Sequence, residues 1–357
     1  MKIGIIGTRG IPNHHGGFEQ FAMFFSVYLA GKGYDVVVYN SSNHPYQSES
    51  WKNVVIKHCY DPEPKIGTAG QFIYDFLSIL DARKQNFDVI FQLGYTSSSI
   101  WGFLFPKESK LITNMDGLEW KRSKYSGVVK SFLKIAEKWA VKQSDILIAD
   151  SKGIQEYILT NYQAESHLIA YGAEKATDFD ESTLNHYNLI KKKYNLVIAR
   201  LEPENNIEPV LKAHEEVAKE ELLIIGSTST KHGKYLESKY KKNIRFLGGI
   251  YDFKKLNDLR HFSNLYFHGH SVGGTNPSLL EAMACSCSIV ANDNIFNRAV
   301  LGNDAFYFSD AQSIIDLLTK DINLVEYKQM EINNMTKIET IYNFNNIHEK
   351  LVELINK

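Results

Sequence analysis

Short apolar runs alternate with longer segments in which apolar residues recur about every 3.6 positions, and this alternation occurs twice along the chain. In the first half, strands are expected at Lys2–Gly7, Asp35–Tyr39, Val54–Lys57, Asp88–Leu93, Lys110–Thr113 and Asp145–Ala149. Helices are expected at Phe18–Gly31, Gln71–Lys84, Val128–Lys142 and Ile154–Asn161. Strands separated by helices predict a parallel sheet with crossover connections.

The second alternation begins near Tyr194, after a polar stretch, Glu174–Lys193. Its expected strands are Leu196–Ala199, Leu222–Ile225, Arg245–Leu247, Leu265–His268, Ser288–Ala291 and Ala305–Phe308. Its expected helices are Ile207–Lys219, Phe253–Phe262, Pro277–Ala284 and Ala311–Thr319. We predict an α/β protein with two Rossmann-like doubly wound domains facing a central cleft. The predicted divisions are 1–173, an interdomain connection at 174–193, a second domain at 194–335, and a C-terminal helical segment at 336–357 that can pack back on the first domain.

Composition narrows the class of protein. Hydrophobic residues are 44% and charged residues 23% of 357, which is typical of a folded globular chain and argues against disorder. The net charge of −1 lacks the basic excess of a nucleic-acid-binding protein, so no nucleic-acid partner is expected. Three cysteines cannot form a paired disulfide framework, the N-terminus is not a signal-peptide pattern, and no long uninterrupted apolar run occurs. A cytoplasmic location is expected.

Loops that follow the predicted strands carry the candidate chemistry, because ligands of doubly wound sheets bind at the carboxyl ends of strands. After the first strand, Gly16 and Gly17 precede a helix and offer bare amides to an anion. The alternative is a tight turn in which glycine only satisfies the backbone. The dinucleotide pattern G-x-G-x-x-G is absent there.

The segment His268–Ala284 is the most informative one. Asn276 is a suitable N-cap before Pro277, so Gly273, Gly274 and Thr275 would direct amides toward a phosphate at the start of a helix. Glu281, one turn into that helix, could accept from a ribose diol. The alternative is a well-capped helix with Glu281 in solvent.

Two further strand ends carry charged residues. Arg200 follows the strand at 196–199 and could bind phosphate oxygens, with Glu204 nearby; the alternative is an ordinary surface loop with a salt bridge. In the first half, Asp116 directly follows a strand and could act as a base or orient an acceptor hydroxyl. A turn or cap role for Asp116 is the alternative.

The expected helix at 128–142 has lysines at intervals of four, including Lys130 and Lys134, with Phe132, Ile135 and Trp139 on another face. Such a helix can lie on anionic lipid, or it can be a helix packed on the sheet with a solvated lysine face. Asp178 and Asp180 form a D-x-D pair, but in the polar connection, and the pattern HExxH is absent. We therefore predict no metal and no cofactor.

Taken together, these segments resemble the family 4 retaining glycosyltransferases of GT-B fold, which use nucleotide-diphosphate sugars. The resemblance runs from the Gly16–Gly17 loop through ARL at 199–201 and FLG at 246–248 to PSLLEA at 277–282. Three strings resemble a bacterial rhamnosyltransferase branch more narrowly: NMDGLEWKR at 114–122, ARLEPENN at 199–206 and GHSVGGTNP at 269–277.

The resemblance implies a metal-independent hexosyltransferase that moves L-rhamnose from dTDP-β-L-rhamnose onto a lipid-linked saccharide in surface polysaccharide synthesis. The donor would bind to the second domain and the acceptor to the first. The implied donor residues are Gly16, Gly17, Arg200, Gly249, Ile250, Gly273, Gly274, Thr275, Asn276, Ser278 and Glu281. Asp116 and Glu204 are the implied catalytic residues. The implied acceptor or membrane side, at the cytoplasmic face of the inner membrane, comprises Glu119, Trp120, Lys121, Arg122, Lys130 and Lys134.

This sequence departs from the wider family at two positions. The first glutamate of its E-x7-E pattern corresponds to Gly273, and its phosphate-binding lysine corresponds to Asn205. The alternatives are a transferase of the same fold that uses a UDP- or GDP-hexose, a nicotinamide-dependent oxidoreductase, and a non-catalytic nucleotide-sugar-binding protein.

Overall fold

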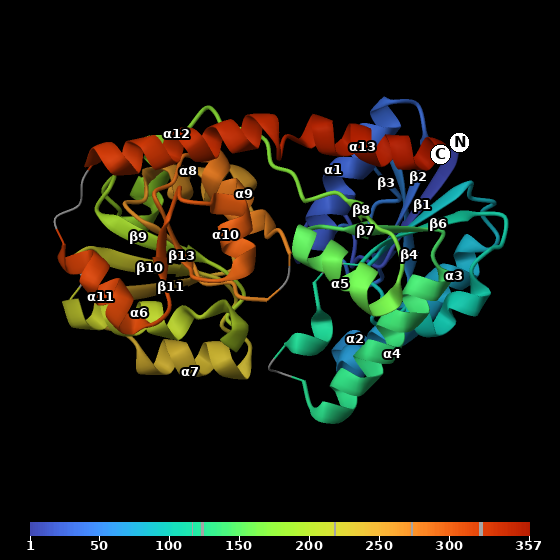
Figure 1. The fold of residues 1–357 in the computed structure, drawn as a ribbon, viewed down its shortest axis with the longest axis horizontal. Coiled ribbons are helices and arrows are strands. Elements are labelled where there is room, and N and C mark those ends of the chain that lie inside the picture. Colours follow the sequence, from blue (N-terminus) through green and yellow to red (C-terminus); the bar gives the residue numbers. More distant parts are fainter. Residues whose placement is uncertain (116, 123–124, 218, 273, 321–323) are drawn as a thin grey trace. The chain divides into compact units, whose positions relative to one another are not determined.

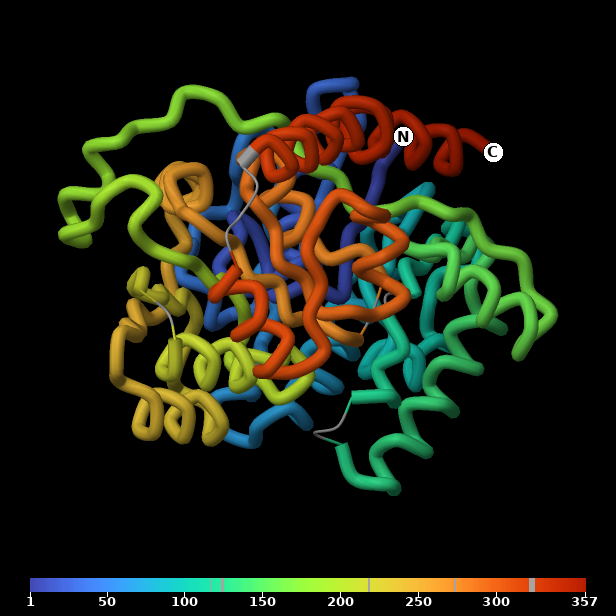
Figure 2. The backbone as a smooth tube through the Cα atoms, turned by 60° about the vertical axis from the view of Figure 1, so that its left-hand side comes forward, coloured from blue at the N-terminus to red at the C-terminus, as the bar shows by residue number. Residues whose placement is uncertain are grey.

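The computed structural model describes residues 1–115, 117–122, 125–217, 219–272, 274–320 and 324–357. The chain divides into two compact units. Unit 1 comprises Met1–Lys121, Tyr125–Ala170 and Ile347–Lys357, and unit 2 comprises Arg122 together with Tyr171–Asn346. Figure 2 follows the backbone through both, with the last residues in red.

Unit 1 is built on an eight-stranded sheet in the order β3-β4-β2-β1-β5-β6-β7-β8, in which only the β3–β4 pair is antiparallel. The strands are β1 Lys2–Ile6, β2 Asp35–Ser41, β3 Ser50–Trp51, β4 Val54–Cys59, β5 Val89–Leu93, β6 Lys110–Asn114, β7 Ile146–Ala149 and β8 His167–Leu168. The helices are α1 Gly17–Gly31, α2 Glu63–Ile66, α3 Gly70–Ala82, α4 Gly127–Gln143 and α5 Lys152–Tyr162, with part of α13 Phe344–Asn356. The central strands are buried along their length, as expected for a parallel sheet covered on both faces.

Unit 2 has a six-stranded sheet, all parallel, in the order β11-β10-β9-β12-β13-β14. The strands are β9 Tyr194–Ile198, β10 Glu221–Ile225, β11 Ile244–Gly248, β12 Tyr266–His268, β13 Ile289–Asn292 and β14 Phe306–Phe308. The helices are α6 Ile207–Val217, α7 Lys231–Lys239, α8 Phe253–Phe262, α9 Pro277–Ala284, α10 Ile295–Leu301, α11 Ala311–Thr319 and α12 Leu324–Thr340. In Figure 1, α6 and α11 lie on one side of these strands and α8 and α9 on the other.

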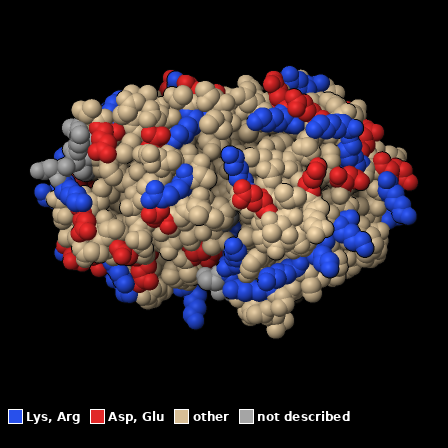
Figure 3. All heavy atoms as spheres, viewed as in Figure 1, with Lys and Arg blue, Asp and Glu red and all other residues tan. Residues whose placement is uncertain are grey.

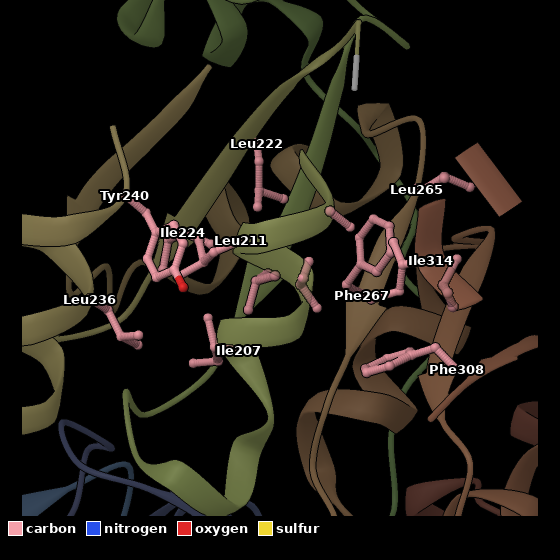
Figure 4. Packing of buried hydrophobic residues seen from close by; sticks show 14 of the residues in the cluster. Ile207, Leu211, Leu222, Ile224, Leu236, Tyr240, Leu265, Phe267, Phe308 and Ile314 are labelled. Carbon is pink, nitrogen blue, oxygen red and sulfur yellow. The ribbon is translucent and has the colours of Figure 1, made fainter. Parts of the chain in front are cut away.

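Alternation along the strands of unit 2 supplies both faces of its core. Leu222 and Ile224 of β10 and Phe267 of β12 pack with Leu211 of α6 and Ile314 of α11 (Figure 4). Tyr266 points to the other face, where its hydroxyl lies 2.7 Å from that of Ser278 in α9. Successive residues of a strand point to opposite faces, so the strands of this sheet contact helices on both faces.

The expected strands and helices are found, with ends shifted by a few residues, and the α/β class with two parallel sheets is confirmed. The sequence pattern missed the short strands β3 and β8, the helices α2, α7 and α10, and most of α12. Helix α12 crosses position 335, where the last segment was expected to begin. Residues of α13 pack on unit 1, for example the ring of His348 at 5.4 Å from that of Phe25.

Candidate functional site

Two loops of unit 2 lie side by side because the strands that precede them, β9 and β12, are neighbours in the sheet. We call residues 200–206 the arginine loop and residues 269–276 the glycine loop, in which Gly273 lies outside the described residues. Asn206 Nδ2 donates to the carbonyl oxygen of Gly269 at 2.9 Å. The backbone nitrogen and the hydroxyl of Ser271 donate to the carbonyl oxygen of Glu204 at 3.1 and 2.8 Å. The two loops are therefore held together by direct hydrogen bonds.

Gly269 allows the two loops to approach this closely. A Cβ atom at this position would lie 2.0 Å from the carbonyl oxygen of Asn205. Since that oxygen belongs to the backbone, a larger residue would have to move the arginine loop itself.

Arg200 has an exposed side chain at the beginning of the arginine loop. Its carbonyl oxygen accepts from Asn205 Nδ2 at 2.6 Å, and Asn205 Oδ1 lies 2.7 Å from Nδ1 of His270 in the glycine loop. Asn205 is 5% exposed, and its side-chain amide supports the conformation of the loop. Arg200 is the accessible cation of the arginine loop.

The glycine loop leads directly into α9. Asn276 Oδ1 accepts from the backbone nitrogen of Ser278 at 2.9 Å and Pro277 occupies the first turn, so the predicted capping is confirmed. Gly274 is half-buried and Thr275 is buried. The positive end of the α9 dipole thus lies at the end of the glycine loop, an environment that favours an anion.

Glu281 forms a buried ion pair with Arg260 of α8. Side-chain exposure is 10% for Glu281 and 1% for Arg260. Burial alone would lower the pKa of Arg260, but the surrounding groups, Glu281 foremost, together outweigh burial and raise it. The alternative of a solvated Glu281 is wrong, and the ribose contact stays a prediction. Ser278, bonded to Tyr266, likewise connects α9 to β12.

Glu204 is the most unusual of the predicted residues. Its side chain is 3% exposed, and neither carboxylate oxygen has a hydrogen-bond partner among the described residues. Nη1 of Arg122 lies 3.6 Å from Oε1 of Glu204. Arg122, predicted on the acceptor or membrane side, therefore lies against the arginine loop of unit 2.

Two histidines, one at the end of β12 and one in the glycine loop, are held neutral. Burial, followed by the charges of Arg122 and Arg200, lowers the pKa of His270 to about 3, and burial lowers that of His268 to about 3. Strand β12 ends at His268, so the two rings do not alternate across a continuing strand, and their centroids lie 6.1 Å apart. Sequence reasoning did not assign either residue to the site.

The remaining predicted donor residues of unit 2 follow β11. Gly248 has a positive φ of 72° and turns the chain, after which Gly249 is exposed and Ile250 half-buried. Strand β11 is two positions from β9 in the sheet, and its loop is held by a hydrogen bond from Gly226 N to Gly248 O at 2.9 Å. Their contact with a nucleobase stays a prediction.

In unit 1, Gly17 begins α1 and Gly16 is its N-cap. Glu19 closes the preceding loop, because its Oε1 accepts from the backbone nitrogen of Arg9 at 2.8 Å. Arg9 in turn donates two hydrogen bonds to Glu63, at 3.0 and 2.9 Å. This loop is thus built on charged contacts that the sequence pattern did not reveal.

Asp116 lies outside the described residues, and its catalytic role stays a prediction. Nearby, a short 3-10 helix runs from Glu119 to Lys121. The centroid of the Trp120 ring lies 4.3 Å from Lys134 Nζ and 5.6 Å from Lys121 Nζ. Both distances suit cation–π contacts, so these side chains form one cluster.

Helix α4 exposes two apolar side chains. Ile135, expected on the apolar face with Phe132 and Trp139, is 48% exposed, and Val128 is 82% exposed. In Figure 3, Lys and Arg side chains gather where Figure 1 shows α4. Lys130 is half-buried and Lys134 exposed on this helix. The buried side is held by Glu137, which accepts from the hydroxyls of three tyrosines: Tyr95, Tyr157 and Tyr162.

Neither a metal cluster nor a membrane span emerges from the described ranges. No group of three or more His, Cys, Asp or Glu side chains within those ranges could hold a metal ion. No helix there is long and apolar enough to cross a bilayer.

Comparisons with known proteins define the class. Residues 181–337 match the family model of glycosyl transferases group 1, and residues 1–174 match a domain of unknown function, DUF1972. An uncharacterized glycosyltransferase of Methanocaldococcus jannaschii is 24% identical over 319 residues, which cover 82% of this chain and 81% of that protein.

Solved structures agree on the fold. Sucrose-phosphate synthase from Thermosynechococcus elongatus superposes with a TM-score of 0.83 at 14% identity, covering 99% of this chain and 98% of that chain. Anabaena HepE, solved with UDP and glucose, gives 0.79 at 14% identity, covering 100% and 99%. The chain has the GT-B fold, and its second half is a group 1 glycosyltransferase domain. It is a glycosyltransferase with homologues in that class.

Proposed function

We propose that this glycosyltransferase moves L-rhamnose from dTDP-β-L-rhamnose onto a lipid-linked saccharide in bacterial surface polysaccharide synthesis, with retention of configuration and without a metal. One observation supports the donor site most strongly: the arginine and glycine loops are hydrogen-bonded together where α9 begins, with Arg200 exposed beside it. A guanidinium and a helix N-terminus together suit a diphosphate.

The proposed chemistry follows from charge. As the glycosidic bond breaks, negative charge develops on the departing diphosphate, and Arg200 with the amides of Gly273, Gly274 and Thr275 would stabilise it. Asn276 holds this helix start in place through its cap. In a retaining transfer, the acceptor hydroxyl attacks the face that the diphosphate leaves, and a phosphate oxygen takes its proton.

Other residues complete the proposed donor site. The main chain at Gly249 and Ile250 would contact the base, Glu281 and Ser278 would lie beside the ribose, and Gly16 and Gly17 would cover the diphosphate. We propose Asp116 and Glu204 as the acidic residues whose loss most reduces the rate of transfer, measured as kcat/KM for the donor.

The acceptor side is proposed on unit 1. Lys130, Lys134 and the Glu119–Lys121 segment gather cations beside exposed Val128 and Ile135. Apolar side chains flanked by lysines suit the surface of an anionic membrane, where a lipid-linked acceptor resides. The protein would then work at the cytoplasmic face of the inner membrane.

A donor screen tests this function. Purified protein is incubated with a lipid-linked GlcNAc or glucose acceptor and dTDP-rhamnose, UDP-hexoses or GDP-hexoses, and products are detected by mass spectrometry. A mass increase of one deoxyhexose with dTDP-rhamnose alone is expected. A product formed only from a UDP-hexose would contradict the rhamnose assignment and support the second candidate, which the UDP and glucose bound by HepE make worth testing.

A further inference from the structure

Glu204 and Arg122 form a buried ion pair in which Glu204 accepts no hydrogen bond from the described residues. At 3.6 Å, with neither Glu204 oxygen in a hydrogen bond among the described residues, the pair lacks the shorter geometry of charge-assisted hydrogen bonds. Side-chain exposure is 3% for Glu204 and 11% for Arg122. Burying a carboxylate without donors is costly, so such a group requires a functional or structural reason.

A second cation, Arg200, belongs to the same loop as Glu204. Arg122 lies 3.6 Å from Glu204 of the arginine loop, which begins with Arg200, and the charges of both arginines act on the neutral ring of His270 in the neighbouring glycine loop. His270 is fixed there, because its carbonyl oxygen accepts from Nδ2 of both Asn294 and Asn297 at 3.0 Å. Two cations beside a helix N-terminus match a ligand with more than one negative charge.

Glu204 does not itself present an accessible group to such a ligand. Both of its carboxylate oxygens are shielded from solvent, and its backbone is fixed by Ser271. A buried carboxylate 3.6 Å from a guanidinium attracts that cation and limits where it can point. Glu204 therefore acts through Arg122.

We infer that Arg122 is a second cation for the diphosphate of the donor, next to Arg200, and that Glu204 is the positioning residue that holds Arg122 at this site. This inference rests on the proposed function and assigns Arg122 to the donor side. It also gives Glu204 a role distinct from contact with the reacting atoms.

Isothermal titration with dTDP, UDP and the corresponding nucleosides tests the role of Arg122. Arg122→Gln should weaken binding of both diphosphates about tenfold or more, because a charged hydrogen bond is lost, and should leave nucleoside binding unchanged. Arg122→Lys should recover part of the loss. The matched control is Arg298→Gln, an exposed arginine of unit 2 paired with Asp293, which should bind both diphosphates like the unmodified protein.

Glu204→Gln tests positioning. It should weaken diphosphate binding several-fold in the parent protein and cause no further loss when Arg122→Gln is present, and it should raise the donor KM more than it lowers kcat. An equal loss in both backgrounds would overturn the positioning role.

Two outcomes distinguish failure of the Arg122 inference from failure of the proposed function. Unchanged diphosphate affinity in a folded Arg122→Gln protein would overturn the inference and leave the proposed donor site intact. If the unmodified protein binds neither dTDP nor UDP, the proposed function fails together with the inference.

Discussion

Replacing Glu281 by glutamine removes one buried charge while keeping the size of the side chain. Arg260, 1% exposed, would retain its charge among neutral acceptors, Asn257 Oδ1 at 3.2 Å and Ser278 Oγ at 3.5 Å. Removing one partner of a buried ion pair costs about 3–5 kcal/mol. Because glutamine still accepts a hydrogen bond, we expect a loss of about 3 kcal/mol in the free energy of unfolding of unit 2.

The positions of the tryptophans allow the unfolding of the two units to be measured separately. All four tryptophans of the chain lie in unit 1: Trp51, Trp101, Trp120 and Trp139. Their fluorescence in urea reports unit 1, whereas hydrogen exchange of the amides in α8 and α9 reports unit 2. Glu281→Gln should speed exchange in α8 and α9 and lower the urea midpoint seen by far-UV circular dichroism.

Controls distinguish charge from shape. Asp293→Asn breaks an exposed pair with Arg298 and should change stability by less than about 1 kcal/mol. The double replacement Arg260→Met with Glu281→Leu should be far milder than Glu281→Gln alone, because no unpaired charge remains. A loss below about 1 kcal/mol for Glu281→Gln would refute this reasoning. If nucleotide affinity then fell at unchanged stability, Glu281 would contact the ligand without stabilising unit 2.

Three further predictions concern other parts of the chain. Burial, opposed by a hydrogen bond from Ser97, raises the pKa of Asp75 to about 7, so the folded state holds a proton that the unfolded state releases, and stability should fall as pH rises from about 4 to 7. In the unmodified protein, the free energy of unfolding should fall by up to about 1.4 kcal/mol per pH unit over this range. Asp75→Asn should abolish that fall in urea titrations at several pH values. The same pH dependence in the variant and the unmodified protein would contradict this. Glu137→Gln should lower the free energy of unfolding, monitored by tryptophan fluorescence, by about 2 kcal/mol, because one amide oxygen cannot accept hydrogen bonds from all three tyrosines. An unchanged free energy of unfolding would refute the stabilising role of these hydrogen bonds. Replacing Lys130 and Lys134 together by Gln should reduce flotation with anionic vesicles about tenfold and leave neutral vesicles unaffected; equal binding would exclude α4 as the contact.

The sequence pattern predicted the two sheets because their strands are buried on both faces and are therefore continuous apolar runs. It missed β3 and β8, each of two residues, because such short strands carry no periodicity. Helix α10 was missed because its cap, Asn294, lies among other polar residues and its helix is only seven residues long.

The candidate site was predictable where local rules apply. The Asn276–Pro277 cap and the position of Arg200 at a strand end follow from capping and topology. The Arg260–Glu281 pair could have been suspected, since each residue lies beside buried apolar residues of its helix and a buried charge requires a partner. The contact between Arg122 and Glu204 joins residues distant in the chain, and no local pattern predicts such a contact.

A crystal structure of the protein with dTDP or UDP tests the central claim most directly. The account predicts phosphate oxygens within about 3 Å of the Arg200 guanidinium and of a backbone amide of the glycine loop, where α9 begins. Phosphates bound away from Arg200, for example at the first loop of unit 1 alone, would contradict it.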